Sequence, residues 1–385
     1  MKIKLKQAFN LQMGKTPARN RPDYWNGENK WISIADIGNT GKFLVKTKES
    51  ITEAGIEGSG IKVVPQGPVI MSFKLSIGKT AITSEDMYTN EAIMAFIDNG
   101  KFAVDTDYLY HLCCGTNWTA GTNKAVMGLI LNKATLLEKE IPLPDINEQH
   151  EIATKLDKID AIIAERQQQL ELIDQLVKSR FIELFGDQTA NPYAWQQTTI
   201  GACCTLKSGT SLPADKENEG GAIPYVKVGD MNYPGNEQYI TTSSRFVSEQ
   251  TAGAGVFPVG TVVFPKRGGA IGTNKKRLTR LPICADLNVM GVTAGRRLTP
   301  QYLMAYFNTV DLGTLNNGSS VPQINNKDIA PLLICIPPMA LQEQFAAFVE
   351  QTDKSKYYSS LSFRYCQAAE NAYRQEWITC RTSDF

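Results

Sequence analysis

The sequence is poor in the residues and spacings on which catalysis usually depends. Histidine occurs only 2 times in 385 residues, and neither copy accompanies a plausible serine or cysteine nucleophile. The 8 cysteines include the adjacent pairs Cys113-Cys114 and Cys203-Cys204 but no C-x-x-C spacing, which argues against a zinc or redox motif. His111 beside the first pair is therefore expected to pack in a core. We predict a non-catalytic chain that holds no metal ion.

Long apolar runs are missing as well. No segment approaches the roughly 20 consecutive apolar residues that span a membrane, and the opening MKIKLKQAFN carries no apolar signal region. Because the cysteines suggest no disulfide framework, we expect a reduced, cytoplasmic protein without a membrane partner. The net charge of +1 decides nothing about nucleic acid, since basic faces and acidic faces cancel in the sum.

What the sequence does contain is a heptad pattern between Ile141 and Asp187. It predicts a coiled-coil helix with Asn147 as its N-cap and Gly186 at its end, which leaves about 38 residues or roughly 57 Å. Arg166 and Arg180 interrupt the seam, and this favours a specific partner helix over open-ended self-association. The seam residues are Leu156, Ile159, Ile163, Leu170, Ile173, Val177 and Leu184.

The chain also repeats itself at an offset of roughly 194 residues, which is too long for a solenoid and indicates a duplicated half. Short β-branched runs punctuated by glycine and proline predict strands with a few helices in each half. With 42% hydrophobic and 21% charged residues, the composition is that of globular domains. The matching positions are Asp36 with Asp230, Tyr108 with Tyr302, Asn132 with Asn326, and Gln149 with Gln344.

We therefore predict an α+β fold with two similar globular domains, residues 1–140 and 188–335, separated by long helices at 141–187 and 336–385. If these helices pack as an antiparallel coiled coil, a pseudo-two-fold axis relates the halves. The second helix is atypical after Lys356, where the heptad pattern gives way to a short apolar stripe. Either a frameshift, recombination or truncation has altered this tail, or it is a divergent helix. The stripe consists of Leu361, Tyr365, Ala368 and Ala372.

Two short motifs imitate enzyme signatures. Pro22-Asp23 followed by Glu28-Asn29-Lys30 spells a nuclease-like pattern, but turn-forming residues fill the segment, so a loop before a strand is the preferred interpretation. The tripeptide Asn191-Pro192-Tyr193 lacks one proline of the sequence with which amino-methyltransferases hold a flipped base. No glycine-rich loop for S-adenosylmethionine precedes it. We interpret it as an interdomain turn before a buried Trp195.

A glycine-rich turn with cations on both sides is the clearest binding signal. Gly268 to Gly272 do not fit the Walker A spacing, so nucleotide hydrolysis is not predicted. Such a turn lets the backbone approach a phosphodiester while flanking cations supply the counter-charge, and Lys74 to Lys79 form its counterpart in the first half. A solvated basic turn without a ligand remains the alternative. The flanking cations are Lys266, Arg267, Lys275, Lys276 and Arg277.

Several segments together resemble the specificity subunit of type I restriction-modification enzymes. The resemblance covers residues 1–356, and the order, duplication and spacing of its motifs carry it more than any single one. The segments are GKTPARNRPDYWNGENKWISIADI, IPYVKVGDM, the stretch from Gly318 to Ile324, and the two junctions IPLP…NEQHEIATKLDKID and IPP…LQEQFAAFVEQTDKSK.

The resemblance implies that each half is a target recognition domain and that the helices act as spacers that also hold methyltransferase subunits. The implied partners are double-stranded DNA, two modification subunits that methylate adenine with S-adenosylmethionine, and two restriction subunits that use ATP and Mg. No cofactor is expected in this chain. Each half would read part of a bipartite target in the major groove. The helix length suggests half-site centres about one to one and a half DNA turns apart, at ~34 Å per turn.

For base reading we predict polar residues of the glycine-rich and early loops, because arginine and lysine reach guanine O6 and N7 and hydroxyls serve either strand. Three alternatives stay open: a coiled-coil scaffold without DNA contact, an enzyme with degenerate motifs, and a silent or phase-variable allele. The predicted residues are Lys15, Thr16, Arg19, Lys74, Ser76 and Lys79 in the first half and Ser208, Thr210, Lys227, Lys266, Arg267 and Lys275 in the second.

Overall fold

The computed structural model describes residues 1–38, 41–74, 76–119, 131–315 and 321–383. The chain forms two compact units, one of residues 1–167 with 361–385 and one of residues 168–360. Each unit combines a globular head with segments of both long helices. We call residues 1–140 head 1 and residues 188–335 head 2. The first residues of the stretch from Gly318 to Ile324 lie outside the described residues.

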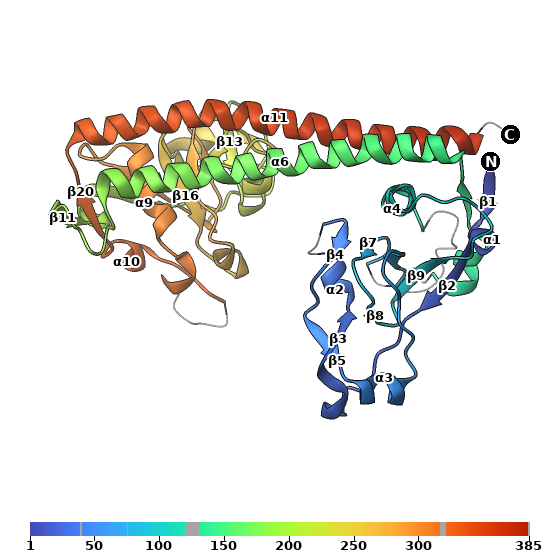
Figure 1. Ribbon diagram of the computed structural model, residues 1–385. Coiled ribbons are helices and arrows are strands. Elements are labelled where there is room, and N and C mark those ends of the chain that lie inside the picture. The colour runs from blue at the N-terminus through green and yellow to red at the C-terminus, as the bar shows by residue number, and fades with distance from the viewer. Residues whose placement is uncertain (39–40, 75, 120–130, 316–320, 384–385) are drawn as a thin grey trace. The chain divides into compact units, whose positions relative to one another are not determined.

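Head 1 is built from short strands and short helices (Figure 1). Its strands are β1 (Lys2–Lys4), β2 (Phe9–Met13), β3 (Trp25–Ile32), β4 (Phe43–Leu44), β5 (Glu49–Ile51), β6 (Val69–Ser72), β7 (Thr80–Thr83), β8 (Tyr88–Thr89), β9 (Ile93–Asp98) and β10 (Glu140–Pro142). Its helices are α1 (Leu5–Ala8), η1 (Pro22–Tyr24), α2 (Ile34–Ile37), α3 (Glu53–Ser59), α4 (Thr106–Gly115) and α5 (Lys133–Leu137).

Two sheets organise head 1, with strand orders β2-β9-β6-β7-β4 and β5-β3-β8, and β1 pairs with β10. Strands β6 and β7 are buried at every position, because the sequence there supplies Val, Ile, Met and Ala with only small polar residues. The core between the large sheet and α4 includes Tyr108, Phe96 and Leu112.

Head 2 repeats this plan. Its strands are β11 (Gln196–Thr199), β12 (Cys204–Ser208), β13 (Ile223–Val226), β14 (Tyr239–Ile240), β15 (Phe246–Val247), β16 (Thr261–Pro265), β17 (Arg277–Thr279), β18 (Cys284–Ala285), β19 (Val289–Ala294) and β20 (Leu333–Ile336). Its helices are α7 (Ile200–Cys203), η2 (Val228–Asn232), α8 (Glu249–Ala252), η3 (Gly253–Gly255), η4 (Gly269–Thr273), α9 (Pro300–Thr309), η5 (Leu312–Leu315) and α10 (Asn326–Ile329).

The strand orders of head 2 are β12-β19-β16-β17-β14 and β15-β13-β18, with β11 paired to β20, so every strand has a counterpart in head 1. The predicted duplication and α+β class are confirmed. The matched pair Asp36 and Asp230 has one structural task in both heads. Each is buried and accepts a hydrogen bond from the backbone N–H three residues earlier, at 2.8 Å from Ser33 and 2.7 Å from Lys227.

The long helix α6 (Ile146–Phe185) matches the predicted heptad helix and has 40 residues. The predicted N-cap Asn147 is wrong by two residues, because the carboxylate of Asp145 accepts the backbone N–H groups of Asn147 and Glu148, both at 3.1 Å. The predicted end is confirmed. Gly186 follows the helix with φ +72°, a left-handed conformation that glycine favours.

The second long helix, α11 (Met339–Ser383), runs through Lys356 without a break. The described part of the tail is helical, and the origin of its sequence stays a prediction. The segment lacks proline and glycine, so the helix continues although its apolar seam is irregular. In unit 1 Trp377 packs this part of the helix against head 1. Only 8% of its surface is exposed, and its ring centroid lies 5.2 Å from that of Tyr108.

The Pro-rich junctions anchor the helices to the heads. The Gln149 amide accepts the Asp105 N–H at 2.9 Å and donates to the carbonyls of Ala103 and Pro144. Gln342 makes the same three bonds, to the Thr299 N–H at 2.9 Å and to two carbonyls. The predicted match of Gln149 with Gln344 is therefore wrong, since Gln342 is buried and Gln344 is exposed.

Seam residues of α6 pack as expected for a helix pair. Leu156 is fully buried in unit 1, and the other seam positions are partly buried. In unit 2 the helices run antiparallel, because Phe345 of α11 meets Phe181 and Phe185 of α6 at 5.6 and 5.5 Å. Arg180 forms an ion pair with Glu183 at 2.8 Å, so its charge at a seam position has a carboxylate partner. Among the described helices, none is long and apolar enough to cross a membrane.

Candidate DNA interface

The glycine-rich turn of head 2 is a short 3-10 helix, η4, held at the end of β16. Gly268 adopts φ +73° at its start, a conformation that a side chain would strain. The neighbouring chain fixes the turn, because Gly268 N–H donates to the Pro322 carbonyl at 2.8 Å and Ile324 N–H donates to the Lys266 carbonyl at 2.9 Å. Arg267 is exposed at this rim.

Strand register makes Lys74 the counterpart of Arg267. Met71 of β6 pairs with Met94 of β9, and Phe264 of β16 pairs with Met290 of β19. Lys74 and Arg267 each lie three residues beyond these positions. Within the described residues neither cation forms an ion pair, and Lys74 contacts only the ring of Phe73 at 5.2 Å. The same end of both large sheets thus carries a cation that has no ion-pair partner in the part of the chain that the structure describes.

The other predicted residues at this rim are partly engaged. Lys266 Nζ donates to Ser208 Oγ at 2.9 Å, which brings the ends of β16 and β12 together. Burial, and secondly the charge of Arg267, lower the pKa of Lys266. In head 1 Ser76 is exposed and Lys79 is half-buried. The structure therefore groups Ser208, Lys266 and Arg267 in head 2, with Lys74, Ser76 and Lys79 at the equivalent place in head 1.

The early-loop residues of head 1 have partners inside the protein. Arg19 forms a bidentate pair with Glu49 at 2.5 and 3.1 Å, and its guanidinium lies 3.8 Å from the ring centroid of Trp25. Lys15 donates to the Ser59 carbonyl at 3.1 Å, and the Thr16 hydroxyl donates to Glu91. These contacts compete with any base contact, because DNA would have to displace them.

In head 2, too, predicted residues away from the strand ends have partners inside the protein. Lys227 Nζ binds both carboxylate oxygens of Glu217 at 2.6 Å, and Lys275 donates to the Asn232 side chain. Thr210 uses its backbone, donating to the Ala285 carbonyl at 2.8 Å. Of the twelve predicted residues, Lys74 and Arg267 have no ion-pair partner among the described residues, Lys266 and Ser208 bond to each other, and Thr210 is exposed. The side chains of Lys15, Thr16, Arg19, Lys227 and Lys275 bond to other parts of their own head.

Comparisons with known proteins agree with this architecture. Residues 1–173 and 192–357 match the family model described as the type I restriction modification DNA specificity domain. The chain belongs to this family. The MjaIX specificity subunit of Methanocaldococcus jannaschii is 24% identical over 375 residues, which cover 90% of this chain and 85% of that protein.

Two solved structures share the fold of this specificity subunit. One comes from work on assembly and conformational transition of the type I restriction-modification system, with 19% identity and a TM-score of 0.60. The other is the S subunit from M. genitalium, with 15% identity and a TM-score of 0.57. In each case the match covers 98% of this chain and 96% of the other.

Two of the cations predicted to flank the glycine-rich turn do not lie free on the surface beside Arg267 in this specificity subunit. Lys276 is 5% exposed, and its ammonium donates to Asn274 Oδ1 at 2.8 Å and to the Val310 carbonyl at 2.7 Å. Arg277 is half-buried and donates to the carbonyls of Asn236 and Met231. The expectation that both face a phosphodiester is wrong, because both side chains donate to acceptors within head 2. Sequence spacing alone could not show this.

The enzyme-like motifs assemble no catalytic site among the described residues. Asp23 pairs with Arg21 at 2.7 Å, while Lys30 of β3 pairs with Glu85. His111 and Cys113 are buried as predicted, whereas Cys114 is exposed, and no group of three potential metal ligands occurs in the described ranges. Trp195 is half-buried, not buried, with its indole N–H donating to the Phe185 carbonyl at 3.3 Å.

Proposed function

We propose that this specificity subunit reads a bipartite DNA target, with head 1 contacting one half-site and head 2 the other. One observation carries the proposal: Lys74 and Arg267 occupy equivalent strand ends and have no ion-pair partner in the described chain, whereas the more distant Arg19 and Lys227 are paired with Glu49 and Glu217. A cation without an internal carboxylate partner can bind a phosphate or a guanine edge.

The long helices set the distance between half-sites and dock the modification subunits. Exposed apolar side chains on α6 support docking, because Leu172 and Leu176 are 52% and 51% exposed where a solvated helix face would be polar. We propose two modification subunits, which bring S-adenosylmethionine and methylate adenine, and two restriction subunits, which bring ATP and Mg. A relative named as a type I restriction enzyme specificity subunit, and a similar structure from work on assembly of the type I restriction-modification system, support this class of assembly.

The test is DNA binding by the chain assembled with its modification subunit. Arg267→Ala should weaken binding by about 1–3 kcal/mol, and if the contact is to a phosphate the salt slope should fall by about one. Arg296 provides the matched control. It is an exposed arginine of head 2 that follows β19, at the opposite end of the strand pair from Arg267.

The two arginines distinguish a specific contact from a general charge effect. Arg296→Ala should leave both the affinity and the salt slope close to those of the parent chain. Equal losses for Arg267→Ala and Arg296→Ala would contradict the assignment, and so would no loss for either variant. Lys74→Ala should weaken DNA binding as Arg267→Ala does. The loss of base discrimination should then be confined to the half-site that head 1 contacts.

A further inference from the structure

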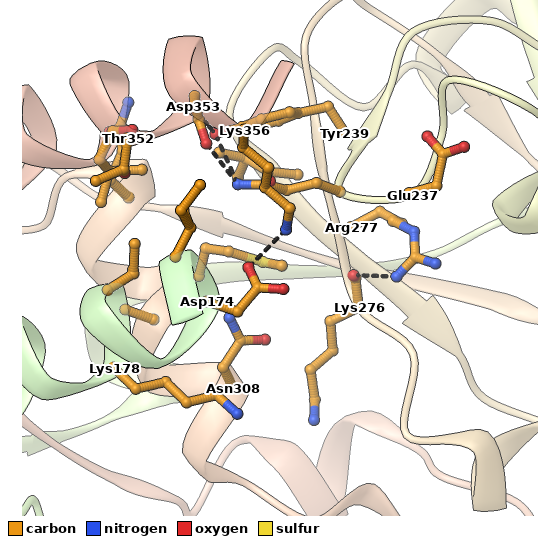
Figure 2. A pocket seen from close by; sticks show the side chains of 18 of the residues that line it. Asp174, Lys178, Glu237, Tyr239, Lys276, Arg277, Asn308, Thr352, Asp353 and Lys356 are labelled. Atoms are coloured by element: carbon orange, nitrogen blue, oxygen red, sulfur yellow. Dashed lines mark hydrogen bonds and ion pairs between the residues drawn. The ribbon is translucent and has the colours of Figure 1, made fainter. Parts of the chain in front are cut away.

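Unit 2 contains a cavity of about 300 Å³ between head 2 and the helices. Figure 2 shows side chains that enter it from α6, from α11 and from the strand edge of β17. Helix α9 contributes Asn308. The charged lining residues are the cations Lys178, Lys276, Arg277 and Lys356 and the carboxylates Asp174, Glu237 and Asp353.

Each carboxylate of the cavity already has donors. Asp174 pairs with Lys356 at 2.5 Å, the ion pair drawn in Figure 2. Asp353 accepts from Gln238 at 2.8 Å and from Arg280 at 3.1 Å, and Glu237 accepts the Gly235 N–H at 3.0 Å. Among the described residues no carboxylate lies within salt-bridge distance of Lys178 or Lys276, although Glu237 keeps its negative charge and the charge of Asp311 opposes the effect of burial on the pKa of Lys276.

The cavity is lined by four cations and three carboxylates. The Lys178 ammonium and the Asn308 amide are exposed to solvent and have no hydrogen-bond or ion-pair partner within the described residues. Lys276 uses two of its three N–H groups on neutral acceptors, and burial lowers its pKa to about 8. Val310 caps the C-terminus of α9, whose dipole favours a cation. The contact with Val310 partly explains why a cation occupies position 276. It does not involve Lys178 or Asn308.

Head 1 shows that the shared fold does not need these charges. Val262 pairs with Leu278 as Val69 pairs with Ile82, so Lys276 and Arg277 align with the neutral Thr80 and Ala81. Unit 1 has its own cavity beside α4, and its charges are Asp160, Glu370 and Arg374, with carboxylates in the majority. The basic lining is thus specific to unit 2.

We infer that the unit 2 cavity binds a small oxyanion, a phosphate or a carboxylate group, through Lys178, Asn308 and Lys276. Amine and amide donors that line one cavity are groups that bind such anions. The volume lies at the lower end for small-molecule sites. The inference does not depend on DNA reading.

Calorimetric titration of the full chain with inorganic phosphate and, separately, with citrate tests this site at constant ionic strength in chloride. Saturable binding is expected for at least one anion, and the one that binds identifies the oxyanion class. The double variant Lys178→Gln, Asn308→Ala should weaken binding about tenfold. Lys327→Gln, which changes an exposed lysine of head 2, should bind like the parent.

Proton uptake provides a second readout that a folding defect would not imitate. Near pH 8 an anion beside Lys276 should raise the protonated fraction of its ammonium, so the binding heat should vary with the ionisation enthalpy of the buffer. This variation should vanish in Lys276→Met. Absence of saturable binding by either anion would overturn the inference. Binding that the double variant leaves unchanged would overturn it as well.

Discussion

At the scale of single residues, His111 in unit 1 is fully buried beside two carboxylates of α6. Its Nε2 lies 2.8 Å from Asp157, and its Nδ1 lies 3.9 Å from Asp160. Cations surround the group, since Lys42 binds Asp157 and Asp107 and Arg374 of α11 donates to the His111 carbonyl. Glu370 also faces Asp160. Protonation of one member of this cluster therefore affects the others.

The two central groups respond to acid in opposite directions. Burial lowers the pKa of His111 to about 4, so below its ordinary pKa of about 6.5 the unfolded chain binds the proton first and stability falls as pH falls. Burial raises the pKa of Asp160 to about 6, so the folded chain binds that proton first and stability rises as pH falls. The effects oppose each other between about pH 6 and pH 4.5.

Single variants should reveal each contribution. Asp160→Asn removes the opposing effect of Asp160, so the free energy of unfolding of unit 1 should fall by up to about 1.4 kcal/mol per pH unit below pH 6.5 because of His111. In His111→Gln it should hold steady or rise over the same window. Urea unfolding at several pH values measures both slopes. Parallel slopes in the two variants would contradict the opposed assignment.

Some residues of the candidate DNA interface could be predicted from the sequence, and others could not. The glycine-rich turn, Lys74 and Arg267 could be identified because glycine and cation spacing is a local signal. The internal partners of Arg19 and Lys227 could not, since Glu49 and Glu217 meet them only through tertiary folding. Lys276 was assigned to the wrong surface for the same reason, because its acceptor at Val310 meets it only through tertiary folding.

At the scale of elements, the junction glutamines are the anchors of the long helices. Gln149→Ala and Gln342→Ala each remove three hydrogen bonds and leave buried backbone groups unsatisfied. Each should destabilise its own unit by about 3 kcal/mol. Gln344→Ala is the matched control, because this exposed neighbour should change stability by less than about 0.5 kcal/mol. Denaturant unfolding compares them, and an effect of Gln344→Ala equal to that of Gln342→Ala would reject the assignment.

A second prediction concerns Trp377 in the C-terminal part of α11. Trp377→Ala should destabilise unit 1 by about 3 kcal/mol, because it removes a nearly buried ring that packs on Tyr108. Tyr358→Ala, at a residue 69% exposed on the same helix, should have little effect. Hydrogen exchange of α4 provides the measurement. Unchanged protection in Trp377→Ala would mean that the tail does not stabilise unit 1.

Elements were predictable where their signal is periodic. The heptads located α6 almost to its ends, and duplicated motifs predicted the repeated heads. The helix at 336–385 was predicted, but its packing after Lys356 was not, because that packing relies on Trp377 and Arg374, which follow no a/d pattern. The N-cap was misplaced because Asp145 and Asn147 are both good capping residues, and only the backbone geometry selects between them.

At the scale of the whole molecule, the duplicated heads should be functionally separable. Exchanging residues 1–140 for those of another family member should change one half-site and leave the other half-site and the spacer unaltered, because each head has its own sheets and core. Methylated-motif sequencing of the hybrid gives the result. Alteration of both half-sites would show that the heads do not read independently.

The central claim is that this chain selects a bipartite DNA target. The most direct measurement is single-molecule methylome sequencing of a methylation-free host that expresses the chain with its cognate modification subunit. We expect one new bipartite motif with methylated adenine in both parts and an unread spacer between them. Soluble chain that co-purifies with the modification subunit, yet yields no new methylated motif, would contradict the claim and favour a silent allele.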